Sequence, residues 1–579
     1  MMYLNLFHRS ESGEKAAIVR RQQKIVHARG LKTTMFLQYA ELFDDVCLAQ
    51  AIEDRKQFGD EIALGLHKMA GPGMEECVHG NNSFWLFPKN RKREVLARVL
   101  ERYREVIGES PRSLACYHLD ASSNEILREL SPETETVVGG CFEEGVRVYH
   151  GCNNSWYLFN EGMPWSPWYP SKTHSLRPAA DAADACGLLA VPHLVRDMSL
   201  AYEDRDDFWA SHPPNVMRGL GNTGSFCPYD LNLVDQYRMQ ERFNGGMSYY
   251  NSFVSAGWLG YNKNIEVPPV VAWELYGKLL DYLARLKADG QLLDLTLSEY
   301  GDWFRSNRPL GAVPSEVYWA KEMLYGSGKH YLWYLDPSHR VLVDTDQGGS
   351  IGDYRPYVGR VPVATGPDTP HREMGSYPYI IQSQHRTGFS THHRDGSRTT
   401  LYLTRGTETV DLARSRTKCR CLDRGDDATR IVLAPAVVRF EDGVEFSVAT
   451  TLAFHPGGRI LVSRTLSGPP DEVLHCREWF KGAHGFTEYS EDLHDIRLDA
   501  GAGPVDFEYL GRSWSGTGAV AAEIPAVHTR IELAPESGRL SCSGVEEGYL
   551  FNPYFALYLD YEVRTGETFQ TWITSKSTK

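Results

Sequence analysis

The stretch Leu31-Lys-Thr-Thr-Met-Phe-Leu-Gln38, with the residues that follow it as far as His67, decides the fold. It opens as a short apolar strand and passes through an acidic turn into a helical pattern over residues 46–58. Gly59 ends that helix, and a second apolar run, Glu61-Ile-Ala-Leu-Gly-Leu-His67, follows at once. Because a parallel connection needs a crossover of about a dozen residues, the two strands and their helix form a parallel unit. We therefore expect a parallel α/β sheet or barrel, with its reactive groups at the carboxyl ends of the strands.

Length and composition narrow the class of protein. A chain of 579 residues is long enough for two or three domains. Its formal net charge of −14 argues against nucleic acid as a partner, because phosphate backbones are bound by clustered Lys and Arg. The one basic run, Lys89 to Arg93, is expected to begin a solvated helix. We find neither the ~18-residue apolar run of a membrane helix nor a signal peptide, and expect no membrane association and a cytoplasmic protein with reduced thiols.

The pattern of elements changes near residue 307. Before it, apolar strands alternate with amphipathic helices. The expected strands are at residues 3–7, 31–38, 61–67, 113–119, 136–141, 187–191, near 249 and at 292–297. After it, short alternating runs are cut by turns such as Asp442-Gly443, which is typical of an antiparallel sandwich. The expected fold class is α/β plus all-β: a barrel over residues 1–308, a linker over 309–330 and a β-sandwich over 331–579.

Two stretches of the first half resemble a known superfamily. Gly30-Leu-Lys-Thr-Thr-Met-Phe-Leu37 and Gly59-Asp-Glu-Ile-Ala-Leu-Gly-Leu-His67 are similar to the second and third strands of the polysaccharide-deacetylase-like barrel. That irregular seven-stranded (β/α) barrel is shared by carbohydrate deacetylases and by glycosidases of the alpha-mannosidase and amylopullulanase type. Leu119-Asp120-Ala121 and Trp168-Tyr-Pro-Ser171 also resemble a bacterial two-domain family in which a sandwich follows the barrel. The resemblance implies a carbohydrate-active enzyme.

The chain departs from the metal site of that superfamily. Its deacetylases carry an Asp-Asp pair after strand one and two His four residues apart after strand three. Here strand one ends in Phe7-His8-Arg9-Ser10 without an Asp, and Gly71 stands four residues after His67. One of the three implied metal ligands survives. We therefore expect no metal and no other cofactor.

Two carboxylates are the expected catalytic residues. Asp120 and Glu143 each follow an apolar strand, so in a parallel barrel both open onto one face. Two carboxylates that face one sugar can act as acid and as base or nucleophile, which is what glycoside hydrolysis requires. The alternatives are that Asp120 caps the following helix and that Glu144 takes the place of Glu143.

Other strand-end residues are expected to shape the sugar site. His67 would bond a sugar hydroxyl or hold a surviving metal, and with His118 and Asp120 it forms the alternative metal site. Arg9 and Arg196 could clamp the carboxylate or sulfate of an acidic sugar, although a salt bridge to a nearby acid is the ordinary role. Indole rings in polar loops suit sugar faces, or else anchor those loops. The expected binding residues are Arg9, Gln38, Tyr39, His67, His118, Glu144, Trp165, Trp168 and Arg196.

These patterns favour a glycoside hydrolase that cleaves short oligosaccharides with Asp120 and Glu143. A metal-dependent carbohydrate deacetylase that uses His67, His118 and Asp120 is the second class of function. A non-catalytic sugar-binding protein is the third. The sequence is compatible with a homo-oligomer in each case.

Overall fold

The first unit of the computed structural model, Met1–Pro314, contains one curled parallel sheet. Its strand order is β6-β5-β4-β3-β2-β1-β7, and β8 pairs with β1. The strands are β1 (Met2–Arg9), β2 (Thr34–Gln38), β3 (Glu61–Gly65), β4 (Ser113–Ala115), β5 (Thr136–Gly140), β6 (Leu189–Pro192), β7 (Ser248–Phe253) and β8 (Leu292–Asp294). The first half of the chain is therefore an open parallel barrel, as the sequence predicts.

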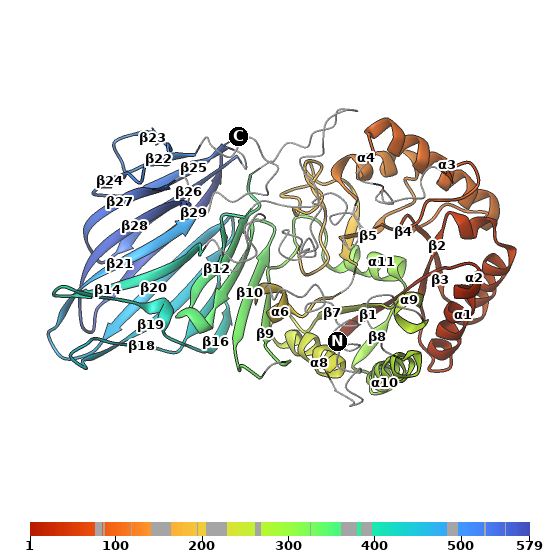
Figure 1. Ribbon diagram of the computed structural model, residues 1–579, viewed down its shortest axis with the longest axis horizontal. Helices are drawn as coiled ribbons and strands as arrows, with labels where there is room; N and C mark the ends of the chain where they lie inside the picture. The colour runs from red at the N-terminus through yellow and green to blue at the C-terminus, as the bar shows by residue number, and fades with distance from the viewer. Residues whose placement is uncertain are drawn as a thin grey trace. The chain divides into compact units, whose positions relative to one another are not determined.

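The structure describes residues 1–75, 84, 87–116, 119–140, 164–193, 195–203, 229–260, 268–324, 326–359, 379–383, 396–482, 496–525, 528–549 and 552–578. Helices follow most strands of the first unit (Figure 1). They are α1 (Glu14–His27), α2 (Asp45–Phe58), α3 (Lys89–Ile107), α4 (Ala121–Leu130), α6 (Met198–Glu203), α8 (Tyr229–Met239), α9 (Ala256–Gly260), α10 (Pro269–Ala288) and α11 (Leu297–Asn307). Among the residues described, no helix is long and apolar enough to cross a membrane.

Helix α11 closes the amino end of the barrel. Its first turn receives side chains from the first residues of two strands: Thr34 Oγ1 accepts from Leu297 N at 2.8 Å, and Glu61 accepts from Ser298 N at 2.9 Å. Tyr300 and Phe304 join the core cluster inside the barrel. Access to the interior of the barrel is therefore expected at the other end, where the strands finish.

The sheet has a seam between its two outer strands. Within the described residues, no backbone pair joins β6 to β7. Trp168 instead pairs with Ala190 on the free edge of β6. Asn251 of β7 crosses the seam with its side chain, donating to Pro192 O at 2.6 Å and accepting from Val195 N at 2.8 Å. These contacts fix the backbone just after β6.

The second unit begins at Ser315 and is built from antiparallel sheets, as the sequence predicts. Its strands form sheets in the orders β13-β12-β11-β10-β9, β15-β14-β21-β28-β27-β24 and β16-β17-β19-β20-β29-β26-β25-β22-β23, with β18 on β19. Their bounds are β9 (Glu316–Lys321), β10 (His330–Asp336), β11 (His339–Asp344), β12 (Ser350–Pro356), β13 (Ile381–Gln382), β14 (Arg398–Arg405), β15 (Glu408–Asp411), β16 (Cys419–Arg424), β17 (Thr429–Leu433), β18 (Ala436–Arg439), β19 (Glu445–His455), β20 (Arg459–Ser467), β21 (Val473–Gly482), β22 (Arg497–Asp499), β23 (Pro504–Asp506), β24 (Ser513–Gly516), β25 (Val520–Ile524), β26 (Thr529–Ser537), β27 (Arg539–Tyr549), β28 (Asn552–Arg564) and β29 (Thr568–Ser577). Strand β9 lies inside the stretch expected to be a linker.

Candidate functional site

Gln38 and His67 meet at the carboxyl ends of β2 and β3. Oε1 of the buried Gln38 accepts from the backbone N–H groups of His67 and Lys68, both at 3.0 Å. Gly65 makes room for this amide, because a Cβ added there would stand 1.8 Å from Gln38 Nε2. The amide of Gln38 is therefore a positioning group that sets where the imidazole of His67 stands.

His67 faces a second histidine that the sequence analysis did not single out. Its Nε2 lies 3.2 Å from Nε2 of His193, which follows β6, and both rings are buried. Phe253 packs on both imidazoles, with ring centroids 5.9 Å from His67 and 4.3 Å from His193. Burial, and then the charges of His193, Arg9 and Lys68, lower the pKa of His67 well below its ordinary value. His67 is therefore held in its neutral form, which can accept a hydrogen bond or hold a metal.

The histidine pair fits two kinds of contact. A separation of 3.2 Å suits a hydrogen bond in which one neutral ring donates to the other. It also suits two ligands of one ion, since imidazole nitrogens about 2.0–2.1 Å from a tetrahedral zinc stand roughly 3.3 Å apart. Within the described ranges, the one group of three His, Cys, Asp or Glu side chains with ligand atoms within 4.8 Å of one another lies elsewhere. The pair therefore supplies two ligands of the kind a metal site needs.

Charged groups surround the end of β1. Arg9 donates to the buried Glu11 at 2.9 Å, and Lys68 donates to the other oxygen of the same carboxylate. Burial alone would raise the pKa of Glu11, but Arg9 and Lys68 outweigh it and lower that pKa below its ordinary value. Arg9 thus has the salt bridge that the sequence analysis gave as its ordinary role.

Asp120 occupies the helix cap that the sequence left open as an alternative. Its Oδ1 accepts from Ser123 N at 2.9 Å at the start of α4. Its Oδ2 accepts from Lys92 Nζ at 2.6 Å and from Ser122 Oγ at 2.8 Å. Both members of the Lys92–Asp120 pair are fully buried. The catalytic role of Asp120 stays a prediction, and its oxygens are already engaged.

Lys92 corrects one expectation. The run Lys89 to Arg93 does begin a helix, α3, but this helix is not solvated throughout, because Lys92 faces inward to Asp120. The amphipathic face of α3 carries it into the interior together with Leu96 and Leu100. A buried lysine requires a counter-charge, which Asp120 provides.

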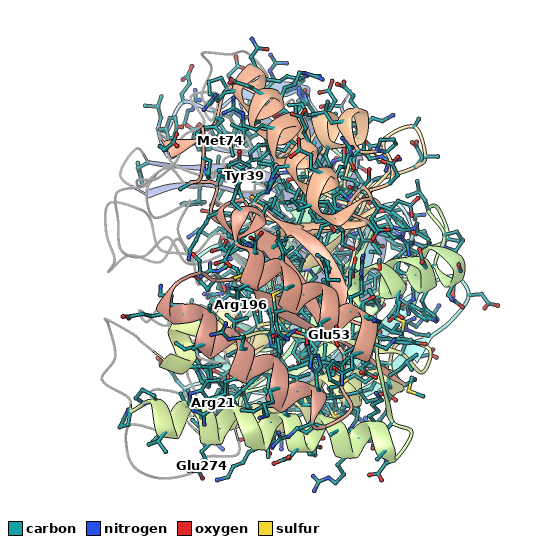
Figure 2. The ribbon with its side chains drawn as sticks, turned by 90° about the vertical axis from the view of Figure 1, so that its right-hand side faces the viewer. Arg21, Tyr39, Glu53, Met74, Arg196 and Glu274 are labelled. Atoms are coloured by element: carbon teal, nitrogen blue, oxygen red, sulfur yellow. The ribbon has the colours of Figure 1, made fainter. Side chains whose placement is uncertain are left out.

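The remaining binding candidates differ in their surroundings. Tyr39, labelled in Figure 2, is buried, and its hydroxyl donates to Pro72 O at 3.0 Å. Trp168 donates from Nε1 to Ser175 O at 2.9 Å, and Trp165 is buried beside it in the chain, so both have the burial of loop anchors. Arg196, also marked in Figure 2, follows β6 and is almost completely buried. Stacking of either indole on a sugar stays a prediction.

Three of the predicted site residues, His118, Glu143 and Glu144, lie outside the described residues. The stretch 141–163 that would carry the second carboxylate also falls there, with the loop tryptophan Trp156. Their roles as catalytic or binding residues stay predictions. Of the sequence-derived site, the described residues bring together Arg9, Gln38 and His67.

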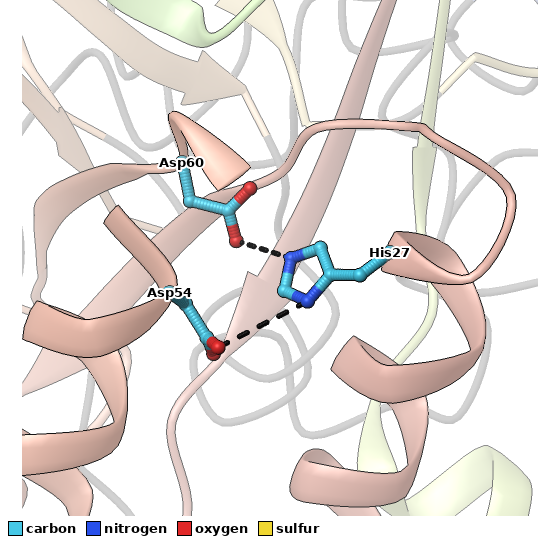
Figure 3. A group of neighbouring side chains, drawn as sticks. All are labelled: His27, Asp54 and Asp60. Atoms are coloured by element: carbon cyan, nitrogen blue, oxygen red, sulfur yellow. Dashed lines mark hydrogen bonds and ion pairs between the residues drawn. The ribbon is translucent and has the colours of Figure 1, made fainter. Parts of the chain in front are cut away.

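A separate cluster lies at the opposite ends of the strands. Figure 3 shows His27 of α1 between Asp54 of α2 and Asp60, which precedes β3. His27 Nε2 lies 2.8 Å from Asp60 Oδ2, and His27 Nδ1 lies 3.9 Å from Asp54 Oδ1. Asp60 Oδ2 also accepts from Thr33 Oγ1 at 2.7 Å and from Gln23 Nε2 at 3.0 Å. With its acceptor positions filled, Asp60 ties α1 to β2 and β3 as a structural hydrogen-bond centre.

Comparisons with known proteins give structural likenesses alone. No protein-family model matches the chain, and no curated protein matches it. A protein from Parabacteroides distasonis provisionally described as a glycoside hydrolase/deacetylase is 14% identical, with 64% of this chain and 88% of that chain covered and a TM-score of 0.46. The 4-alpha-glucanotransferase of Thermococcus litoralis is 7% identical, covering 100% of this chain and 99% of that one, with a TM-score of 0.32. A galactose mutarotase related enzyme from Lactobacillus acidophilus is 8% identical over 42% of this chain and 97% of its own, with a TM-score of 0.29. At scores below 0.5 these likenesses carry no argument about function.

Proposed function

We propose that this chain is a carbohydrate-active enzyme that hydrolyses short oligosaccharides at the carboxyl ends of its barrel strands. The observation that carries the proposal is the convergence of Gln38, His67 and His193 at that end, with Phe253 packed on the two imidazoles. Neutral imidazoles can exchange hydrogen bonds with sugar hydroxyls, and an aromatic wall excludes water from a reacting bond. Helix α11 blocks the other end, so a substrate enters where these groups lie.

In the proposed glycoside hydrolysis, Asp120 and Glu143 act as the acid and the base or nucleophile. Because Lys92, Ser122 and Ser123 engage its oxygens, Asp120 must release one of these hydrogen bonds before it can take a proton or attack a sugar. Glu143 therefore carries the larger part of the proposed acid–base chemistry. The same contacts would hold Asp120 in one orientation throughout the reaction.

The histidine pair favours a second candidate, a metal-dependent carbohydrate deacetylase. His67 and His193 are the described residues that would hold the ion, and a bound divalent metal polarises an acyl carbonyl and lowers the pKa of a coordinated water. Gln38 then serves to fix the position of one ligand through the backbone of His67. This candidate replaces the set His67, His118 and Asp120 by a set that includes His193, the residue directly after β6.

One assay separates the two reactions. The intact chain is given matched acetylated and unacetylated oligosaccharides, and both new reducing ends and free acetate are measured before and after chelation. A glycoside hydrolase releases reducing ends, keeps its activity after chelation and loses it in Glu143→Gln. A deacetylase releases acetate, loses activity after chelation and loses it in His193→Ala.

A control and a contrary result complete the test. Glu129→Gln alters a half-exposed side chain of α4 and should leave either activity unchanged. Binding of oligosaccharides without any release of reducing ends or acetate would refute both reactions and favour a sugar-binding protein.

A further inference from the structure

The backbone of Arg196 is held in a defined place in the segment that follows β6. It follows His193 by three residues, and the intervening Val195 is bonded through its N–H to Asn251 of β7 at 2.8 Å. The hydroxyl of Tyr237 donates to Arg196 O at 2.8 Å, and Arg196 N donates back to that hydroxyl at 3.2 Å. The backbone N–H and C=O of Arg196 are thus both hydrogen-bonded. The guanidinium is the part of this residue that can bind a ligand.

Within the part of the chain that the structure describes, Arg196 differs from other buried arginines in its ion pairing. Arg196 is only 5% exposed, yet among the described residues no carboxylate pairs with it and no acceptor bonds it. Arg177 in the preceding loop pairs with Asp184 at 2.7 Å, and Arg464 of the second unit pairs with Glu478 at 2.6 Å. A buried cation without a counter-charge is costly, and an incoming anion would remove that cost.

Arg9, the other arginine at a strand end, is less suited to bind an anion. Its guanidinium donates to Glu11, which Lys68 also engages. An anion near the strand ends would therefore find its strongest partner in Arg196. A guanidinium matches the two oxygens of a carboxylate or sulfate with two parallel hydrogen bonds.

We propose that Arg196 binds an anionic substituent, a carboxylate or a sulfate, on the sugar that the barrel processes. The substrate class is then acidic oligosaccharides, and this inference rests on the proposed function of the same site. Charge-assisted bidentate bonds of this kind should favour the acidic sugar over its neutral counterpart about ten- to a hundredfold in affinity.

The test compares matched probes by calorimetry on the full chain. The probes are maltose and cellobiose, and their counterparts in which the terminal CH₂OH of the non-reducing sugar is a carboxylate or a 6-O-sulfate. The wild-type chain should prefer the acidic counterparts about ten- to a hundredfold. Arg196→Met should abolish that preference, and Arg196→Lys should retain part of it, since the charge remains but the planar fork is lost. Whichever of the two anions is preferred identifies the substituent.

Controls separate recognition from folding. Arg93→Gln removes a half-exposed arginine from α3 and should keep the preference. Arg177→Met breaks a buried ion pair and should lower the melting temperature, whereas Arg196→Met should not, because it removes a buried charge that pairs with no carboxylate among the described residues.

The possible failures are distinguishable. An equal affinity of the wild type for acidic and neutral probes, or the same preference in Arg196→Met, would overturn the inference even if oligosaccharides are hydrolysed. An Arg196-dependent preference without turnover would support the inference and overturn the proposed catalysis.

Discussion

Lys92 Nζ lies 2.6 Å from Asp120 Oδ2, and neither side chain is exposed to solvent. Lys92 comes from α3 and Asp120 from the start of α4, so this ion pair joins two helices of the barrel. Removing one partner of a buried ion pair leaves an uncompensated charge and costs about 3–5 kcal/mol.

The first prediction concerns this pair. Lys92→Met should lower the free energy of unfolding by about 3–5 kcal/mol, measured by urea denaturation. Asp120→Asn should also destabilise, and the double variant should lose less than the sum of the two single changes. If Asp120→Asn instead lost its turnover while keeping the unfolding free energy of the wild type, Asp120 would be a catalytic residue and not chiefly a cap.

The second prediction concerns metal binding by the histidine pair. If His67 and His193 are ligands, the purified chain should bind a divalent transition metal, and His67→Ala or His193→Ala should each reduce its affinity by orders of magnitude. Elemental analysis after dialysis against zinc measures this directly. As the control, His475→Ala changes a partly exposed histidine of the second unit and should not alter the strand-end metal content. Equal zinc content in all four proteins would show that the pair is only a hydrogen bond.

The third prediction tests the positioning role of Gln38 without changing either histidine. Gly65→Ala places a Cβ 1.8 Å from Gln38 Nε2, so the amide must move away from the N–H groups of His67 and Lys68. Two buried donors would lose their acceptor, at a cost of about 1–3 kcal/mol each. We expect a lower melting temperature together with reduced activity. Gly257→Ala in α9, where the nearest atom would be 3.7 Å away, should leave both properties nearly unchanged.

The fourth prediction concerns acid stability. Burial lowers the pKa of His8 from 6.5 to about 4, although its bond to Gln23 opposes the shift. Between these two pKa values, His8 binds a proton in the unfolded chain but stays neutral in the folded chain. The free energy of unfolding therefore falls as pH drops from about 6.5 towards 4. The full effect is about 3 kcal/mol for one group. His8→Gln should flatten this dependence in urea denaturation at pH 7, 6, 5 and 4.5, and an unchanged slope would contradict the assignment.

The fold could be predicted because its decisive signals are local. The helix between Gln38 and Glu61 and the glycine at position 59 are read from adjacent residues, and they appear as α2 between β2 and β3. The alternation beyond Asn307 likewise becomes antiparallel strands, because a period of two places every second side chain in the core.

The site could be predicted only in part, because its decisive contacts are long-range. His193 stands 126 residues after His67, and its sequence signal, a histidine just past an apolar strand, was the same one that identified His67. The burial of Lys92 could not be predicted from the basic run that contains it, because composition does not tell which lysine of a helix faces inward. For Asp120 the sequence allowed a cap and a catalytic acid equally. The cap is a local bond from Ser123 N, whereas the ion pair that engages the other oxygen comes from Lys92, 28 residues away.

The position of β1 within the sheet has a consequence for how this protein is made. The first strand pairs with β2, but also with β7 at residues 248–253 and with β8 at residues 292–294. On the ribosome, the amino-terminal segment must therefore wait for nearly three hundred further residues before both of its edges are covered. A nascent chain of this length exposes an unpaired strand edge for much of its synthesis, and such an edge is open to pairing with other chains until β8 has been made.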